Sequence, residues 1–357
     1  MRVLYFGTYE RWYPRNAQVI SCLRRAGVEV QERHVPVWEA NEHKWRAGAG
    51  AALRLAAAQA RLLARPAAAA GADALLVGYP GHFDVPAARR VARGRPVVFN
   101  PLVSLADTFV SDRRRFRPGS VPARLLETVD RRALRAADLV VADTASNARH
   151  LRELGGLEPE RTAVCFVGAE ERLFHPVWRR PKQFTALFVG KMIPLHGLET
   201  VLDAARIAAE IPFRIVGNGQ LEHLLRARPP NVDWVPWVDY ERLPGELGDA
   251  GCALGVFGRS EKAARVIPNK AFQALACGTP LVTADTPAAR ELLVDGESAL
   301  LVPPGDAEAL AVAIRALAAD AALAELIGAD GLAVYTKRAS EEVLGARWRG
   351  LLEILVG

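Results

Sequence analysis

The sequence predicts an α/β protein of two Rossmann-like domains, each a doubly wound parallel sheet with helices on both faces. Its 357 residues are enough for two hydrophobic cores. Apolar runs of strand type alternate with amphipathic helical stretches along the chain, which is typical of parallel sheets. Residues 176–182 hold two prolines and three basic residues and separate two such series. We expect domains of residues 1–178 and 179–340 with a cleft between them.

The first half begins with an apolar strand over residues 1–7, and Pro14 then starts a helix that runs to Gly27. Further strands are predicted over residues 28–34, 74–78, 96–100, 139–142 and 162–167. Further helices are predicted over residues 44–65, 84–93 and 122–137, and from Ser146 onward. The opening lacks the G-x-G-x-x-G turn of dinucleotide-binding domains, so a dinucleotide is not indicated.

The second half repeats this alternation. Strands are predicted over residues 184–189, 213–216, 232–235, 252–257, 280–283 and 299–302. Helices are predicted over residues 198–209, 221–226, 240–247, 269–277, 287–293 and 308–318, and a last helix over 341–355.

Residues 265–282 combine a loop, a helix and a strand. Pro268 suits the first helical turn, and Gly278 suits a left-handed cap at its end. Backbone N–H groups, the helix dipole and Lys270 together suit a diphosphate at the start of this helix. The alternative is an ordinary strand–helix–strand unit with a solvated lysine.

Positive charge is concentrated in the first half. Residues 1–178 carry 27 lysines and arginines against 18 acidic residues, whereas residues 179–357 carry 19 against 22. This asymmetry favours an anionic partner such as an anionic membrane surface, a phosphorylated acceptor or nucleic acid. The basic amphipathic helix over residues 44–65 either lies on anionic lipid or packs on the sheet with its arginines in water. Solvated arginines are the alternative to any such partner.

Compartment and metal content follow from what the sequence lacks. No run approaches the ~18 apolar residues of a membrane span, and the N-terminus enters a strand without a secretory signal. The four cysteines show neither close pairing nor metal spacing. We therefore expect a reduced, cytoplasmic setting, with any membrane contact peripheral and at the inner face, and no metal site.

Acceptor-binding residues are expected in loops beyond the carboxyl ends of the first-half strands, where such sheets bind ligands. The loop over residues 7–16 is dense in aromatic and polar groups, and its candidates are Gly7, Thr8, Tyr9 and Arg15. Gly7 either lets a ligand approach the backbone or serves a plain tight turn. The loop after residues 96–100 adds Asp107 and Asp112, which either face an acceptor hydroxyl or cap a helix.

Four segments, taken in order, resemble motifs of GT-B glycosyltransferases. Residues 167–176 resemble the N-G-V-D-x-x-x-F-x-P junction, and residues 189–199 resemble G-[RK]-x4-[KH]-G-x-E/D. Residues 215–219 resemble the I-V-G-x-G turn, and residues 281–296 resemble the segment after the donor helix. The chain thus resembles the retaining, sugar-nucleotide-dependent glycosyltransferases of the large bacterial group 1 family with the E-x7-E motif.

The resemblance implies a nucleotide-diphosphate-sugar donor in the C-terminal domain and an acceptor in the N-terminal domain. It implies transfer to a hydroxyl of a carbohydrate, lipid-linked or small-molecule acceptor, with retention and without an obligatory metal or other cofactor. Cell-envelope, polysaccharide, glycolipid or secondary-metabolite glycoside synthesis would be the setting. The final helix, 341–357, is implied to pack back on the N-terminal domain.

Catalysis must stabilise negative charge on the leaving diphosphate. Lys191, Lys270 and Arg265 are the expected cations, and Asp107 is the catalytic candidate on the acceptor side. The expected donor-binding residues are Gly190, His196, Gly217, Asn218, Gly219, Trp237, Val238, Leu243, Ile267, Pro268, Asn269 and Gln273.

Arg265 and Gln273 occupy the two E-x7-E positions and depart from the motif. Gln273 retains the capacity to hydrogen-bond a ribose hydroxyl, since its amide both donates and accepts. Arg265 only donates, so we expect it to bind phosphate or an acidic group on the sugar. The loss of both carboxylates leaves a nucleotide-sugar-binding pseudoenzyme as one alternative. A sugar-nucleotide 2-epimerase, which shares the two-domain architecture but fits the junction motif less well, is another. Nucleic-acid binding is not expected, because the arginines are scattered and no recognition module is apparent.

Overall fold

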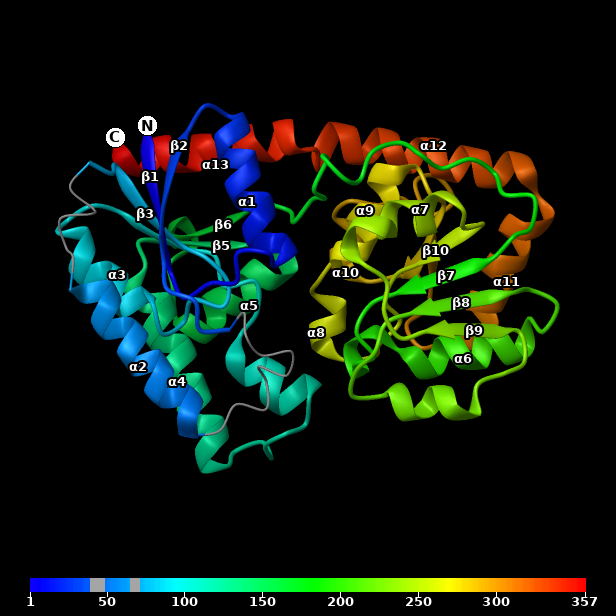
Figure 1. Ribbon diagram of the computed structural model, residues 1–357, viewed down its shortest axis with the longest axis horizontal. Coiled ribbons are helices and arrows are strands. Elements are labelled where there is room, and N and C mark those ends of the chain that lie inside the picture. The colour runs from blue at the N-terminus through cyan, green and yellow to red at the C-terminus, as the bar shows by residue number, and fades with distance from the viewer. Residues whose placement is uncertain (39–48, 65–70) are drawn as a thin grey trace. The chain divides into compact units, whose positions relative to one another are not determined.

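The structure, a computed structural model, describes residues 1–38, 49–64 and 71–357 (Figure 1). It forms two compact units. Unit 1 comprises Met1–Val167 together with Glu341–Gly357, and unit 2 comprises Gly168–Ser340. In the described residues each unit contains one six-stranded, wholly parallel sheet with helices packed against it, as the sequence predicts.

Unit 1 has the strand order β2-β1-β3-β4-β5-β6. Its strands are β1 (Arg2–Gly7), β2 (Glu29–His34), β3 (Ala74–Val77), β4 (Val97–Phe99), β5 (Leu139–Ala142) and β6 (Thr162–Val164). Its helices are α1 (Pro14–Arg25), α2 (Ala49–Leu63), α3 (Val85–Ala92), α4 (Val121–Ala136), α5 (Ala145–Gly155) and α13 (Glu341–Val356). The part of the helix expected over residues 44–65 that precedes Ala49 lies outside the described residues.

Alternate residues of β1 enter two different cores. Val3 and Tyr5 pack with side chains of α1 and α13, including Leu23 and Trp348. Leu4 and Phe6 pack on the other side with residues of α3, α4 and α5. The two-residue period of a strand explains this division, and both faces of the sheet are therefore covered.

Unit 2 has the strand order β12-β11-β10-β7-β8-β9. Its strands are β7 (Ala186–Val189), β8 (Phe213–Val216), β9 (Val232–Val235), β10 (Cys252–Leu254), β11 (Leu281–Ala284) and β12 (Leu300–Val302). Its helices are α6 (Leu198–Ile207), α7 (Leu243–Gly248), α8 (Glu261–Ala264), α9 (Asn269–Cys277), α10 (Pro287–Arg290), α11 (Ala307–Ala319) and α12 (Ala321–Arg338).

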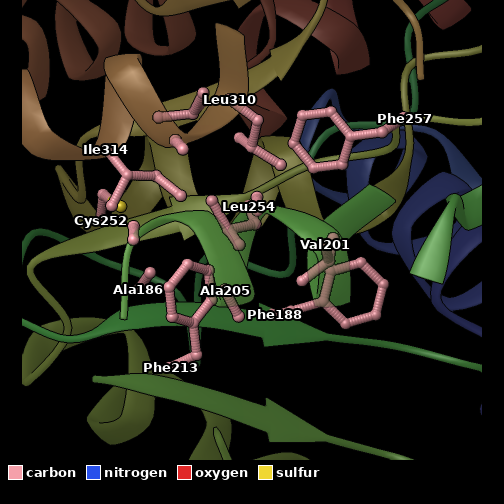
Figure 2. Close-up of a cluster of buried hydrophobic side chains, with 14 of the residues drawn as sticks. Ala186, Phe188, Val201, Ala205, Phe213, Cys252, Leu254, Phe257, Leu310 and Ile314 are labelled. Carbon is pink, nitrogen blue, oxygen red and sulfur yellow. The ribbon is translucent and has the colours of Figure 1, made fainter. Parts of the chain in front are cut away.

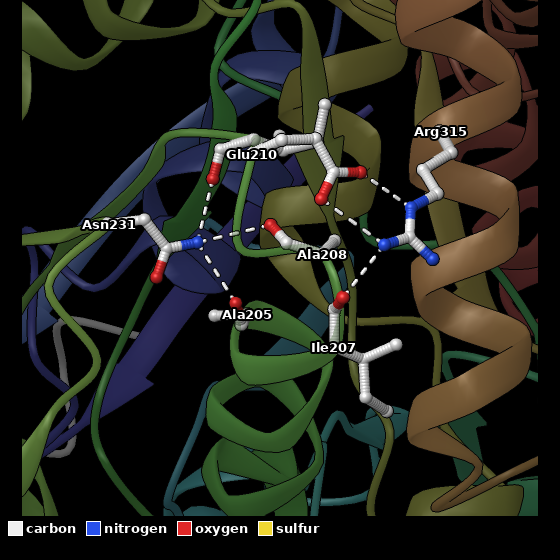
Figure 3. Close-up of polar contacts among 7 residues, drawn as sticks. Ala205, Ile207, Ala208, Glu210, Asn231 and Arg315 are labelled. Atoms are coloured by element: carbon white, nitrogen blue, oxygen red, sulfur yellow. Dashed lines mark hydrogen bonds and ion pairs between the residues drawn. The ribbon is translucent and has the colours of Figure 1, made fainter.

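One core of unit 2 lies between its sheet and the helices α6 and α11. Phe188, Phe213 and Leu254 project from three strands toward Val201 of α6 and Ile314 of α11 (Figure 2). The carboxyl end of α6 is closed by side chains from neighbouring elements. Asn231 Nδ2 donates to the carbonyls of Ala205 and Ala208, and Arg315 donates to the Ile207 carbonyl (Figure 3). These bonds satisfy the carbonyls that a helix end leaves open.

Helix α12 was not predicted from the sequence. Its two internal glycines weaken a helical pattern, but here they allow close packing. A Cβ at Gly328 would lie 2.5 Å from the Gly278 carbonyl oxygen, and a Cβ at Gly331 would lie 2.9 Å from Leu275 Cδ2. The glycines therefore fit α12 against α9 and the turn after it.

The division between the units falls at Val167, earlier than the expected boundary at residue 178. The segment after Gly168 is held by unit 2. The backbone N–H groups of Val177 and Trp178 both donate to the Cys277 carbonyl, at 3.2 and 3.0 Å. Trp178 Nε1 also donates to the Ala250 carbonyl at 2.7 Å. Because of these long-range hydrogen bonds, the segment belongs to unit 2, although its composition is typical of a linker.

Arg15 is completely buried and serves the interior of unit 1, in place of the expected acceptor contact. Its guanidinium donates to Asn100 Oδ1 at 3.0 and 3.2 Å and to the carbonyls of Cys165 and Phe166 at 3.1 and 2.7 Å. The group also lies 5.8 Å from the centre of the Trp348 ring. Arg15 thereby joins α1 to the ends of β4 and β6 and to α13.

Gly7, Thr8 and Tyr9 also have partners within unit 1. A Cβ at Gly7 would lie 2.5 Å from Asp84 Oδ2, so the carboxylate fills the space beside this glycine. The Thr8 backbone N–H donates to the same oxygen at 2.7 Å. Tyr9 is buried, and its hydroxyl donates to Glu32. Of the two alternatives for Gly7, approach of a ligand or a plain turn, the structure favours the turn, because Asp84 makes the close approach.

We expect Arg15→Gln to lower the free energy of unfolding of unit 1 by about 3 kcal/mol, because buried carbonyls lose charged donors. Arg24→Gln is the matched control on α1, since its exposed pair with Glu32 contributes about 0–1 kcal/mol. Urea unfolding measures both. Equal midpoints for the two variants would contradict the structural role of Arg15.

Asp84 makes unit 1 less stable as the pH rises. Burial raises its pKa from 3.8 to about 6, against the opposing hydrogen bonds from Thr8 and Gln59. Between pH 3.8 and about pH 6 the folded state therefore binds more protons than the unfolded state. The free energy of unfolding falls as the pH rises through this range, because the buried carboxyl loses its proton. The loss amounts to about 3 kcal/mol.

Asp84→Asn should remove this contribution, so the wild type should lose stability relative to the variant between pH 4.5 and pH 7.5. Asp203→Asn, which changes an exposed carboxylate on α6, is the control. Denaturant midpoints at both pH values make the comparison. If the difference in denaturant midpoint between the wild type and Asp84→Asn is the same at both pH values, the predicted role of Asp84 is wrong.

Candidate functional site

The topology of unit 2 indicates where a ligand can bind. Ligands of open parallel sheets lie beyond the carboxyl ends of the strands, at the point where the strand order reverses. Strands β8 and β9 continue on one side of β7, and β10, β11 and β12 continue on the other, so the reversal falls between β7 and β10. Gly190 and Lys191 directly follow β7, and the connection from β10 leads through α8 to α9, which carries Lys270.

Lys270 is a buried cation at this point of the sheet. The residue is only 9% exposed, and its Nζ has no hydrogen-bond partner among the described residues. Nζ lies 3.5 Å from the centre of the Phe188 ring. Burial lowers the pKa of Lys270 well below its ordinary value. A buried ammonium without a hydrogen-bond acceptor is costly, and an anion that reached Nζ would supply one.

Gly190 provides space beside this amine. Its φ of 149° lies in a region that residues with side chains rarely adopt. A Cβ there would lie 3.3 Å from Lys270 Nζ and 3.1 Å from His196 Cε1. The Gly190 backbone, the His196 ring and the Lys270 amine therefore line one small region.

The start of helix α9 adds to this positive region. Its N-cap residue is Pro268, which offers no side-chain cap, and its first turn contains no acidic residue. The positive end of the helix dipole and Lys270 both favour an anion here. Lys191, next to Gly190, is exposed.

The glycine-rich turn after β8 supports the segment after β7. A Cβ at Gly217 would lie 2.0 Å from the Gly190 carbonyl oxygen, and a Cβ at Gly219 would lie 2.9 Å from the Met192 nitrogen. The Asn218 carbonyl accepts a hydrogen bond from the Met192 N–H at 2.9 Å. The space that we expected these glycines to leave for a nucleotide is used for packing one backbone on another.

Gln273 has a partner that the sequence did not reveal. Its Nε2 donates to the Tyr240 hydroxyl at 3.2 Å, and the Tyr240 ring lies edge-on to Phe174, with ring centres 5.5 Å apart. Burial is the main reason that the pKa of Tyr240 rises to about 12. Tyr240 thus holds the amide that we expected to contact a ribose.

Arg265 lies at the carboxyl end of α8 and forms an ion pair with Glu261, with Nη1 and Oε2 3.4 Å apart. Glu261 is almost fully exposed, so this pair is open to solvent. The remaining donor candidates differ in burial. Leu243 and Ile267 are buried, Val238, Pro268 and Asn269 are half-buried, and Trp237 is exposed.

The acceptor-side aspartates lie in a short π-helix, Asp107–Asp112, where we expected a loop. Asp112 is buried, and its Oδ2 lies 3.7 Å from Arg113 Nε. Asp130 of α4 anchors the start of this segment, because it accepts hydrogen bonds from Ser104 Oγ and from two backbone N–H groups. It also lies 3.3 Å from the buried His82. Asp130 and His82 were not expected, because their contacts are long-range.

In residues 1–38, 49–64 and 71–357, no group of three or more His, Cys, Asp or Glu side chains is arranged to hold a metal ion. Within the same residues, no helix combines the length and the apolar character needed to cross a membrane.

Comparison with known proteins shows similarity to one family of glycosyltransferases. Residues 183–320 match the family model for glycosyl transferases group 1. The chain is 35% identical over 157 residues to the phosphatidyl-myo-inositol mannosyltransferase of Mycobacterium leprae, covering 41% of this chain and 40% of the relative. It is 30% identical over 224 residues to the D-inositol 3-phosphate glycosyltransferase of Thermomonospora curvata, covering 50% and 49%. These matches span about half or less of the relatives' length.

A solved structure shares the fold of the whole chain. Anabaena HepE, determined in complex with UDP-glucose, superposes with a TM-score of 0.71 at 16% identity, covering 99% of this chain and 100% of HepE. The family match lies within unit 2, the unit that carries Lys270 at the reversal of its sheet. Unit 2 is similar to the glycosyl transferases group 1 family, and the chain has the GT-B fold class that its sequence predicts.

Proposed function

We propose that the protein transfers a sugar from a nucleoside-diphosphate-sugar donor to an acceptor hydroxyl, with the donor diphosphate bound in unit 2. The observation that carries this proposal is the buried Lys270 amine, which lies beside Gly190 at the reversal of the sheet and has no hydrogen-bond partner in the part of the chain that the structure describes. The family match covers this region, and the structurally similar HepE is known in complex with UDP-glucose.

The chemistry needs positive charge where the sugar–phosphate bond breaks. The bond from the anomeric carbon to the diphosphate breaks, and the acceptor oxygen forms a new bond to that carbon. The hydroxyl proton passes to a released phosphate oxygen, so charge is balanced. Lys270, Lys191 and the start of α9 would stabilise the diphosphate as its charge develops. We further propose that the anomeric configuration is retained, as in the enzymes that the sequence resembles.

A nucleotide-sugar-binding protein without turnover is the second candidate. Both residues at the E-x7-E positions have partners inside unit 2, because Arg265 pairs with Glu261 and Gln273 bonds to Tyr240. Neither position supplies a carboxylate to a sugar hydroxyl. Like the first candidate, this protein would bind the nucleotide-sugar donor, but it would not transfer the sugar.

A panel of nucleotide sugars separates the two candidates. We expect UDP- or GDP-sugars to raise the thermal midpoint of the full chain, since a ligand that binds the folded state stabilises it. Release of the nucleoside diphosphate with an acceptor mixture would establish transfer, and stabilisation without release would establish the second candidate. If no nucleotide sugar and no free nucleoside diphosphate shifts the midpoint, both candidates fail.

Lys270→Met should lower turnover by roughly 10²–10³-fold, the scale for loss of one contact to developing charge. The same change should raise the free energy of unfolding by about 1–3 kcal/mol without ligand. It removes a buried donor for which the described residues offer no acceptor, while it keeps the apolar stem. Activity assays and denaturant unfolding test the two parts. Reduced turnover with higher stability is not expected of a residue whose role is structural.

Lys191→Ala is the companion variant. Lys191 is exposed, so stability should change by no more than about 0.5 kcal/mol while turnover falls on the same scale as for Lys270. Arg265→Gln belongs in the same series, because an equal loss would place Arg265 at the phosphate. Near-normal turnover in both lysine variants would show that neither lysine stabilises the diphosphate, and that each is a solvated or structural residue.

A further inference from the structure

A basic and apolar surface lies at the start of α4 in unit 1. It comprises Arg114, Arg115, Arg117, Val121, Arg124 and Leu125, and we call it the α4 surface. The chain from Arg113 to Leu126 contains five arginines and no acidic residue. Nothing in the proposed transfer reaction uses these side chains.

Two aliphatic residues of the α4 surface face solvent. Helix α4 packs on unit 1 through Ala123, Ala133 and Leu134. Val121 and Leu125, one turn apart, lie away from that buried side and are 80% and 63% exposed. A single exposed aliphatic residue is ordinary, but two neighbours on the solvent side of a helix form an apolar contact site.

Exposed arginines flank this site in the sequence. Arg124 lies between the two aliphatic residues in the helix, and Arg114, Arg115 and Arg117 lie in the preceding loop. The Arg115 guanidinium is positioned over two aromatic rings, 6.0 Å from the centre of Phe109 and 5.7 Å from that of Phe116. Its charge is therefore held at the surface with less loss of side-chain entropy on binding.

We propose that the α4 surface binds the face of an anionic lipid bilayer, with Val121 and Leu125 in the headgroup–acyl boundary and the arginines against lipid phosphates. Positive charge favours an anionic partner, and exposed aliphatic side chains within that charge favour a partner with an apolar layer beneath it. Nucleic acids and acidic proteins satisfy the charge but offer no such layer. The binding does not depend on the proposed transfer reaction.

Partition of the full chain into phosphatidylcholine vesicles, with and without phosphatidylglycerol, tests the proposal. We expect binding only with phosphatidylglycerol, weakened by salt because exposed charges are screened. The variant Arg117→Gln with Arg124→Gln should lower partition roughly 30-fold, since each surface arginine contributes about fivefold. The matched control is Arg131→Gln with Arg132→Gln, which removes the same charge further along α4 and should keep nearly full binding.

The variant Val121→Ser with Leu125→Ser distinguishes a bilayer from other polyanions. It should lower vesicle partition roughly tenfold and leave heparin binding unchanged, because heparin offers no apolar layer. All variants change exposed residues, and an unaltered thermal transition confirms their folding. Equal binding to neutral vesicles, equal losses in the two arginine pairs, or unchanged partition of the serine variant would each overturn the proposal.

Discussion

Each sheet reverses its strand order once, and this reversal limits where the protein can bind a ligand. Parallel strands carry all their carboxyl ends to one edge, and connecting helices leave room for a ligand only where they pass to opposite faces. In unit 2 the reversal separates β7 from β10. Gly190 and Lys270, distant in sequence, meet there because each belongs to the connection that follows one of these strands. The position of the candidate anion site is thus set by topology before any side chain is considered.

The two units contain buried cations of opposite character. Arg15 in unit 1 is completely enclosed, and its guanidinium has acceptors from Asn100, Cys165 and Phe166. Lys270 in unit 2 is nearly as enclosed, but its amine lies over the face of Phe188 and has no hydrogen-bond acceptor among the described residues. Satisfied donors stabilise a fold, whereas an unsatisfied buried donor reduces stability unless a ligand completes it. Burial alone therefore does not identify a functional residue. The distinguishing feature is whether the buried group has hydrogen-bond partners within the protein.

The sequence predicted the strands of both sheets because local patterns of apolar residues determine them. It missed α12, because Gly328 and Gly331 are unfavourable in a helix. Both glycines are needed there for close packing against residues distant in the sequence. It also assigned Arg15 to the acceptor, since an arginine in a strand-end loop looks the same whether it faces water or carbonyls. Tyr240 as the partner of Gln273 was equally hidden, because 33 residues separate them. What sequence analysis missed consists of long-range contacts, and these decide the role of individual side chains.

Three glycines that follow or end strands show this limit most clearly. Gly7, Gly190 and Gly217 each have a strongly positive φ, and from sequence each suggests close approach of a ligand. At Gly7 the space is filled by the Asp84 carboxylate, and at Gly217 it is filled by the backbone of Gly190. At Gly190 the neighbours are the ends of two side chains, His196 and Lys270, and the Lys270 amine has no hydrogen-bond acceptor among the described residues. The same backbone geometry thus supports a structural turn twice and a candidate ligand site once, and the hydrogen bonding of the neighbouring groups separates the cases.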